Sequence, residues 1–323
     1  MTTPRVSVVV PAYQAGATIG AAIASILTQS YREFEVVVVD DGSTDATPAI
    51  VQAHSGRITL VRQENAGVAA ARNRGVAEAT GELITFCDAD DILFEQHLEA
   101  LVATFDAHPG TLATANSYWL LPGGIDPSKL RYKGRFPAPE TQRMAILEQN
   151  FVSTMSVFPR RIVDEIGGFD ERKLRAEDWD FWLRTIFAGH RFVLQRRPLS
   201  LYRWSAASLS SNREEMDAEV EAVLDGVGEK FELTEDERAY LARRRSGPGP
   251  RHLGRAGDAA LRERRYDEAA RYYREAAALV PSERMLVWKA RTMSAAPRIV
   301  GPAVRGRQLR IERRLGFDEG HVR

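Results

Sequence analysis

The chain has 323 residues, 44% of them hydrophobic and 27% charged, and its 44 Lys and Arg residues balance 44 Asp and Glu residues. A chain of this length can bury one large core or two unequal ones, and its zero net charge argues against bulk attraction to nucleic acid. The single cysteine, Cys87, excludes an internal disulfide framework and a cysteine-built zinc site.

The first part of the chain alternates between strand-like and helix-like segments. A β-branched run predicts a central parallel strand at Val6–Val10, which we expect Pro11 to end because proline cannot donate to the ladder. The next predicted elements are a helix at Ala15–Ser30, a strand at Phe34–Val39, a helix at Thr47–His54, a strand at Ile58–Val61, a helix at Ala69–Ala79 and a strand at Leu83–Cys87. This alternation predicts an α/β fold with a mostly parallel central sheet flanked by helices.

Three acids, Asp88, Asp90 and Asp91, follow the last of these strands. A buried strand would place them at its carboxyl end, where open α/β sheets bind ligands. Crowded carboxylates raise each other's pKa unless a cation lies among them, and their oxygens suit Mg²⁺ or Mn²⁺ shared with substrate phosphates. We expect Asp88 and Asp90 to bind the metal, against the alternative of a solvated turn, and Asp91 to cap a helix that follows at Ile92.

The ends of the other predicted strands and loops carry residues that could contact a nucleotide. Tyr13 offers an aromatic face, Asp41 a carboxylate for a base or ribose, and Gly67 a close backbone approach. Arg72 can donate two parallel hydrogen bonds to a diphosphate. Taken singly, Asp41 would be part of a turn and Arg72 part of a solvated helix face. No spaced glycines follow the first strand, which argues against an NAD site.

The middle of the chain is less regular. We expect a strand at Leu112–Leu121, a long loop at Pro122–Glu140 and a further strand at Asn150–Pro159. Two edge strands, Arg191–Leu194 and Leu199–Trp204, are expected on either side of a proline. Four alternating basic residues in the loop could meet an anionic acceptor or form a solvated charged segment: Lys129, Arg131, Lys133 and Arg135.

A second group of acidic and aromatic residues opens a helix at Glu177. Glu177 and Asp178 suit the first turn of a helix through its dipole and through capping, without any catalytic role. Trp179 and Trp182 lie three residues apart and can share one helix face. Either of them could stack on an acceptor sugar, with core packing as the alternative.

Four motifs in order carry a family resemblance. They are Val6-Ser7-Val8-Val9-Val10-Pro11-Ala12-Tyr13, Val39-Asp40-Asp41-Gly42-Ser43-Thr44-Asp45, Glu64-Asn65-Ala66-Gly67-Val68-Ala69-Ala70-Ala71-Arg72-Asn73-Arg74-Gly75 and Asp88-Ala89-Asp90-Asp91. Together they resemble the family 2 glycosyltransferases with the GT-A fold, over about the first two-thirds of the chain. The resemblance implies a nucleotide-sugar donor, usually a UDP-sugar, and inversion at the anomeric carbon.

The resemblance also implies roles for individual residues. Asp90 would ligate the divalent metal, Mn²⁺ or Mg²⁺, and Asp88 would approach the ribose or sugar. The residues expected to bind the nucleotide sugar are Pro11, Ala12, Tyr13, Asp41, Asn65, Gly67, Arg72, Asp88 and Ala89. Family members commonly carry a histidine two residues after a Tyr-Arg pair to complete the metal shell. Here Ser205 stands at that position, so that ligand is missing.

In the resembled family, the Glu-Asp pair opens a helix beneath the acceptor, and its Asp is the catalytic base. We therefore expect Asp178 to be the base and Glu177 to be an acceptor-binding or structural partner, with Trp179 and Trp182 as further acceptor contacts.

The last quarter of the chain reads as helical. Ser246-Gly247-Pro248-Gly249-Pro250 predicts a linker, and Ala260–Pro281 resembles a single tetratricopeptide-type hairpin. One such repeat cannot bury its own face, so it would pack on the catalytic domain, a second copy or a partner. Arginines among apolar residues near the end predict a basic amphipathic helix that docks on an anionic membrane surface or on the protein. We expect a GT-A domain at 1–212, a helical connector and linker at 213–250, and an α-helical C-terminal region at 251–323.

The resemblance implies an inverting glycosyltransferase of the hexosyltransferase type, active in polysaccharide or glycoconjugate biosynthesis. It would transfer a sugar from a nucleotide-diphosphate sugar to a hydroxyl of a saccharide, lipid-linked or other acceptor. A sugar-phosphate nucleotidylyltransferase and an inactive scaffold with a partner-binding tail are the alternatives. No apolar run approaches the roughly 20 residues that span a bilayer, and a strand begins directly after Arg5, so we expect a cytoplasmic protein, in contact with a membrane only at its surface.

Overall fold

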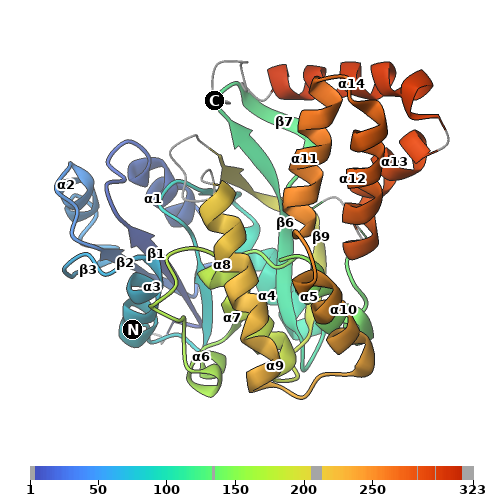
Figure 1. The fold of residues 1–323 in the computed structure, drawn as a ribbon. Helices are drawn as coiled ribbons and strands as arrows, with labels where there is room; N and C mark the ends of the chain where they lie inside the picture. The colour runs from blue at the N-terminus through green and yellow to red at the C-terminus, as the bar shows by residue number, and fades with distance from the viewer. Residues whose placement is uncertain (1–3, 133–134, 205–212, 282, 295, 315–323) are drawn as a thin grey trace.

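Two β-sheets lie at the centre of the molecule (Figure 1). This computed structural model describes residues 4–132, 135–204, 213–281, 283–294 and 296–314. Its strands are β1 (Val6–Ala12), β2 (Phe34–Asp40), β3 (Thr59–Arg62), β4 (Leu83–Phe86), β5 (Ile92–Leu93), β6 (Leu112–Leu121), β7 (Gly124–Leu130), β8 (Phe158–Pro159) and β9 (Phe192–Arg203). The larger sheet has the order β3-β2-β1-β4-β8 and is parallel apart from β8, and the smaller has the order β5-β9-β6-β7.

Helices cover both faces of the larger sheet, which confirms the predicted α/β class. The helices up to residue 187 are α1 (Ile19–Leu27), α2 (Thr47–Gln52), α3 (Val68–Glu78), α4 (His97–Ala107), the 3₁₀ turn η1 (Pro139–Thr141), α5 (Gln142–Glu148), α6 (Arg161–Ile166) and α7 (Glu177–Phe187). Alternate residues of β1 enter different cores: Val8 and Val10 pack in a cluster with α1, whereas Val9 packs with α3. Burial on both faces explains why this strand is an almost unbroken apolar run.

The expectation that Pro11 ends the first strand is wrong. β1 continues through Pro11 to Ala12, and Pro11 lies opposite Val39 of β2. The pairing of β1 with β4 ends at Val9, two residues before Pro11. Because the strand repeats every two residues, the backbone nitrogen of Pro11 faces the β4 side, as the backbone of Val9 does. The missing N–H of Pro11 therefore falls where the ladder with β4 has already ended.

Three other segments differ from the sequence-based expectation. Ile92–Leu93 is a short strand, β5, paired antiparallel to β9, and the helix predicted there begins only at His97. Gly124–Leu130 forms β7 within the region expected to be a loop, where it extends the smaller sheet beyond β6. Of the strand expected over Asn150–Pro159, only Phe158–Pro159 forms a strand, β8, at the edge of the larger sheet, and Val157 makes an isolated antiparallel bridge to Ala113 of β6.

The two edge strands predicted around Pro198 are one continuous strand. β9 runs between β5 and β6, so it is not an edge strand. Its register with β6 shifts between the pairs Ala115–Gln195 and Ser117–Ser200. This irregularity leaves Pro198 out of the hydrogen-bonded ladder, which is how an interior strand can contain a proline.

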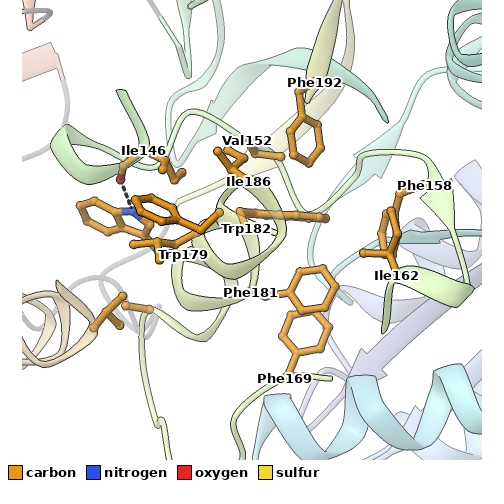
Figure 2. Packing of buried hydrophobic residues seen from close by; sticks show 14 of the residues in the cluster. Ile146, Val152, Phe158, Ile162, Phe169, Trp179, Phe181, Trp182, Ile186 and Phe192 are labelled. Carbon is orange, nitrogen blue, oxygen red and sulfur yellow. Dashed lines mark hydrogen bonds between the residues drawn. The ribbon is translucent and has the colours of Figure 1, made fainter. Parts of the chain in front are cut away.

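An aromatic cluster packs α7 against the rest of the catalytic core. Trp182 is fully buried, and its ring lies 5.4 Å from the rings of both Phe158 and Phe192, in edge-on contacts. Figure 2 shows Trp182 in the middle of this cluster, with Phe181 stacked on Phe169 below it; the centroids of that stacked pair are 4.2 Å apart. These contacts fix the position of α7, whose first turn carries Glu177 and Asp178.

The remaining helices follow the smaller sheet. They are α8 (Arg213–Asp225), α9 (Val227–Lys230), α10 (Glu235–Arg245), α11 (Pro250–Arg262), α12 (Tyr266–Leu279), α13 (Arg284–Ser294) and α14 (Pro297–Arg314). Val220 and Tyr240 share a core cluster with α7, and Arg143 pairs with Glu237 at 2.8 Å, so α8 and α10 pack on the catalytic core. α11 packs on α12 and α12 on α13, with α14 lying across them (Figure 1). None of the helices described by the structure is long and apolar enough to cross a membrane.

Candidate active site

Arg72 connects the two acidic motifs. Its Nη1 donates a hydrogen bond to Glu177 Oε1 at 2.6 Å, and its Nη2 donates one to Asp88 Oδ1 at 2.8 Å. The guanidinium also lies near the rings of Phe86 and Phe169, at 5.7 and 5.4 Å from their centroids. The carboxyl end of β4 and the first turn of α7 therefore meet at one buried arginine.

This arrangement gives Arg72 a different role from the diphosphate contact that the resemblance implies. Its side chain is only 3% exposed, and both terminal nitrogens are bound to carboxylates. Burial alone would lower the pKa of Arg72, but the charges of Asp88 and Glu177 raise it, so it stays cationic. In this structure Arg72 therefore links the end of β4 to the start of α7, and its terminal nitrogens are not free to bind a ligand.

The three acids after β4 differ in their surroundings. Burial, followed by the charge of Asp88, raises the pKa of Asp90 to about 6. Asp91 is 1% exposed, and burial followed by the charges of Asp88 and Asp90 raises its pKa well above the ordinary value. The sequence predicted that Asp91 caps a helix, and this prediction is wrong. Its Oδ1 instead accepts the backbone N–H of Arg203 at 2.8 Å and so holds β9 beside β5.

The carboxylates of Asp88 and Asp90 are suited to bind a divalent cation. Asp88 and Asp90 supply hard oxygen donors, and their mutual repulsion would be relieved by a positive ion. Over the residues that the structure describes, no three His, Cys, Asp or Glu side chains are arranged to hold a metal by themselves. The donor set therefore suits a metal that takes its further ligands from a substrate, as Mg²⁺ and Mn²⁺ do with phosphates. Ser205, at the position of the family histidine, lies outside the described residues.

The predicted nucleotide-binding residues gather where β1 and β2 end. Pro11 and Ala12 are buried at the end of β1, and Tyr13, which follows them, is 54% exposed. Ala89 lies buried after β4, the other neighbour of β1. Gln14 was not singled out from the sequence, yet its side-chain Oε1 accepts hydrogen bonds from two backbone N–H groups of the loop after β2.

Asp41 shapes the loop that leads into α3. Its Oδ1 accepts the backbone N–H of Ala66 and its Oδ2 that of Gly67, both at 2.9 Å. Asn65 Nδ2 donates back to the Asp41 carbonyl at 3.1 Å, which closes the contact between the two loops. Gly67 has a φ of +91°, a backbone conformation that favours glycine. Asp41 is 3% exposed, so its observed part is to position Asn65 and Gly67.

Asp178 is held in a fixed orientation by two donors. Asn150 Nδ2 donates to Asp178 Oδ2 at 2.9 Å, and the backbone N–H of Trp179 donates to Oδ1 at 2.8 Å. The preceding residue, Ala176, has a φ of +54°, an unusual conformation for a residue with a Cβ. Asp178 is partly exposed, whereas Glu177 is buried and paired with Arg72. Asn150 had no sequence signal, because nothing near it in the chain marks a partner for residue 178.

Trp179 and Trp182 do not line an acceptor site. Trp182 is fully buried in the aromatic cluster, and Trp179 is 3% exposed with its Nε1 donating to the Ile146 carbonyl at 2.7 Å (Figure 2). Their burial contradicts the predicted stacking on a sugar and agrees with the core-packing alternative. For Glu177, which was expected to bind the acceptor or to act as a structural partner, the side chain accepts a hydrogen bond from Arg72, as a structural partner would.

One further residue lies among the charges of both motifs. Burial raises the pKa of Tyr202, and the charges of Asp91, Asp88 and Asp178 act on it as well, opposed by Arg131. The Arg131 guanidinium lies 4.9 Å from the centre of the Tyr202 ring. The charges of the acids after β4 and of Asp178 in α7 therefore both act on one tyrosine of the smaller sheet.

Comparisons with known proteins identify a family and several relatives that this chain resembles. The profile of Glycosyl transferase family 2 matches residues 7–167. The succinoglycan biosynthesis protein ExoO of Rhizobium meliloti is 30% identical over 314 residues, which cover 86% of this chain and 88% of that protein. The chain spans between 17% and 50% of the length of the first curated relatives that it matches.

Solved structures share the fold. TarS 1–349 of S. aureus, in complex with UDP-GlcNAc, has a TM-score of 0.63 at 19% identity, with 90% of each chain covered. The mannosyltransferase PcManGT from Pyrobaculum calidifontis, in complex with GDP-Man and Mn²⁺, has a TM-score of 0.58 at 20% identity, covering 98% of this chain and 88% of that one. These likenesses confirm the GT-A fold with a helical C-terminal extension. Together with the match to ExoO over most of both chains, they lead to one conclusion: the chain belongs to glycosyltransferase family 2.

Proposed function

We propose that this protein is an inverting glycosyltransferase that transfers a sugar from a UDP-sugar to a hydroxyl group of a saccharide or lipid-linked acceptor, in the synthesis of a polysaccharide. The names of relatives support the process, since ExoO is a succinoglycan biosynthesis protein. The donor class is supported by TarS, whose structure contains UDP-GlcNAc. The observation that carries the proposal is the Arg72 bridge, because it brings Asp88 and Glu177, and with them Asp178, to one site.

In this proposal Asp178 is the general base. Its two oxygens each accept one hydrogen bond from the protein, which leaves lone pairs free to accept the proton of an acceptor hydroxyl. The acceptor oxygen forms a bond to the anomeric carbon while the bond to the donor diphosphate breaks on the opposite face. Glu177 cannot compete for this role, because its carboxylate is buried against Arg72.

Asp90 and Asp88 would hold the divalent metal. When bound, such an ion supplies positive charge to the departing diphosphate. The chain itself contributes Tyr13 as an exposed aromatic surface for the base, and the loop ordered by Asp41 as a backbone surface for the nucleoside. PcManGT, whose structure contains Mn²⁺, supports this choice of metal.

We propose that the helices after residue 250 form a separate C-terminal unit that begins with a tetratricopeptide-like hairpin of α11 and α12. This proposal is supported by the packing of these two helices and by their shared hydrophobic core, which contains Ala260 and Tyr273. Contact of this unit with a membrane surface or a second copy stays a prediction.

The experiment is to incubate the purified chain with labelled UDP-sugars, Mn²⁺ and a panel of sugar acceptors. Transfer, or slow hydrolysis of one donor, with inverted configuration at the product's anomeric carbon by NMR supports the proposal. Retained configuration would contradict the mechanism. If added pyrophosphate converts the UDP-sugar into UTP and a sugar 1-phosphate, the protein is a nucleotidylyltransferase, and an absence of reaction and of UDP binding would indicate a scaffold.

A further inference from the structure

Arg251 comes from the C-terminal helices but lies beside the proposed base. It occupies the first turn of α11, and its guanidinium lies 5.3 Å from the centre of the Trp179 ring. The backbone N–H of Trp179 in turn donates to Asp178. Through this contact with Trp179, a residue some seventy positions further along the chain lies against the residue that follows Asp178.

The position of Arg251 is fixed by contacts between α11 and α8. A Cβ added at Gly249 would lie 2.6 Å from Glu221 Oε1, so this glycine allows the chain to approach α8 closely. One turn after Arg251, Arg255 pairs with Asp217 of α8. These contacts on both sides hold the start of α11 against α8 and next to α7.

The neighbouring arginines have their own partners, whereas Arg251 does not. Arg244 pairs with Glu221 at 2.8 Å, and Arg255 pairs with Asp217. Among the described residues, no carboxylate forms an ion pair with Arg251. One face of its guanidinium is covered by an indole, which leaves the N–H groups at its edge free for a ligand.

Charged side chains of both signs surround Arg251, which is itself exposed to solvent. Burial lowers the pKa of Arg251 and the charge of Asp217 opposes this; Arg244 and Arg255 lower the pKa further, whereas Asp178 raises it. A guanidinium with a free edge matches the paired oxygens of a phosphate or carboxylate.

We propose that Arg251 binds an anionic group, phosphate or carboxylate, on the acceptor, next to the hydroxyl that Asp178 deprotonates. This inference rests on the proposed function, since it assigns the acceptor side of the same site. It gives the C-terminal unit a part in substrate selection, because α11 supplies the residue that recognises the acceptor's charge.

The test measures dissociation constants of the full chain for three matched sugars by NMR titration: methyl glucoside, methyl glucuronide and methyl glucoside 6-phosphate. We expect one of the two anionic sugars to bind at least 10-fold more tightly than the neutral one. Arg251→Gln should weaken that binding about 10- to 100-fold, as expected for a hydrogen bond to a charged group, and leave the neutral sugar unaffected. Whether the uronate or the phosphate is preferred distinguishes an acidic saccharide from a phosphate-bearing acceptor.

Two variants serve as controls. Arg307→Gln removes an arginine that also lies over an indole, 4.5 Å from the centre of the Trp288 ring, but in α14; it should keep the wild-type preference. Arg251→Lys retains the positive charge without the paired N–H donors of a guanidinium. It should keep part of the preference for the anionic sugar even where Arg251→Gln perturbs folding.

The proposal is overturned if the wild type shows no preference for either anionic sugar, or if Arg251→Gln retains the preference. Equal losses in Arg307→Gln and Arg251→Gln would overturn it too. Binding of UDP with Mn²⁺ is measured separately. If the wild type fails to bind UDP, the proposed function fails, while the sugar titrations still decide the role of Arg251.

Discussion

Arg72 and Glu177 lie 105 residues apart in the chain, yet their side chains meet at 2.6 Å. The same guanidinium reaches Asp88 with its other terminal nitrogen, and its Nε is buried with no partner among the described residues. α3, the end of β4 and the start of α7 thus share one buried charge cluster. The cluster couples the donor side of the site to the helix that carries Asp178.

Breaking this cluster should destabilise the fold. Glu177→Gln leaves the buried Arg72 with only Asp88 as its charged partner, and we expect the free energy of unfolding in urea to fall by about 3 kcal/mol. The double variant Arg72→Met with Glu177→Gln should lose less than the sum of the two single changes. Arg74→Met, which removes an exposed pair with Glu78 on the same helix, should change stability by less than about 1 kcal/mol and is the control. Strict additivity of the two buried changes would contradict the coupling.

Asp178→Asn should remove the base and little else. Asparagine keeps the size of the side chain, so we expect kcat to fall about 10²- to 10⁴-fold while the Kd for UDP with Mn²⁺ stays unchanged. Asn150→Ala should have a smaller effect, about 2- to 10-fold, because it only frees the carboxylate to rotate. Steady-state transfer and calorimetry measure the two quantities. Full transfer activity in Asp178→Asn would place the base elsewhere.

Asp90→Ala should abolish metal-dependent binding of UDP. The carboxylate is the proposed ligand of the ion that neutralises the diphosphate, so calorimetry in Mn²⁺ should give the weak affinity that the wild type shows in EDTA. Asp170→Ala, which removes an aspartate paired with Arg172 elsewhere on the protein, should bind UDP like the wild type. Unchanged UDP affinity in Asp90→Ala would move the metal site.

His97 should make the fold sensitive to acid. It is fully buried with its ring nitrogens 3.1 Å from the carbonyl oxygens of Leu199 and Met155, and burial lowers its pKa to about 4. Between pH 6.5 and 4 the unfolded chain binds a proton at this residue that the folded chain does not. The free energy of unfolding therefore falls as the pH falls through this range, by about 3 kcal/mol from His97.

The check on His97 is a comparison of urea unfolding between the wild type and His97→Gln at several pH values. The stability difference between the two proteins should shrink as the pH falls from 6.5 to 4, since glutamine does not titrate. A difference independent of pH would show that His97 does not change its protonation on unfolding.

Asp258 should hold the C-terminal helices together. Its carboxylate accepts hydrogen bonds from Tyr273 of α12 at 2.6 Å and from Lys289 of α13, whose side chain is 8% exposed. Asp258→Ala leaves a buried cation unpaired, so we expect about 3 kcal/mol of local destabilisation, seen as faster amide hydrogen exchange in α11–α13. The double variant Asp258→Leu with Lys289→Met should restore protection. If exchange in Asp258→Ala equals that of the wild type, this pair does not stabilise the helices.

Much of the fold was accessible from the sequence because the signals are local. The apolar runs at β1, β2 and β4 were predicted at or near their observed bounds, since burial on both sheet faces requires an almost uninterrupted apolar segment. The α3 and α7 helices were predicted for a similar reason, since each combines helix-forming or helix-starting residues with a clear first residue. Edge elements such as β7 and β8 were missed or overextended, because a strand without two-sided burial carries no such pattern.

The sequence by itself singled out the acids after β4 from their types and order, whereas the functional role expected of the Glu-Asp pair of α7 came from the resemblance to the family. Only the tertiary structure decided what each one does. It showed that Arg72 is buried between two carboxylates and that Trp182 lies in the core instead of facing a sugar. It also placed Arg251, which no sequence pattern singled out, against Trp179. The physical reason is that motifs are set by spacing along the chain, whereas burial and charge partners depend on contacts between residues far apart in it.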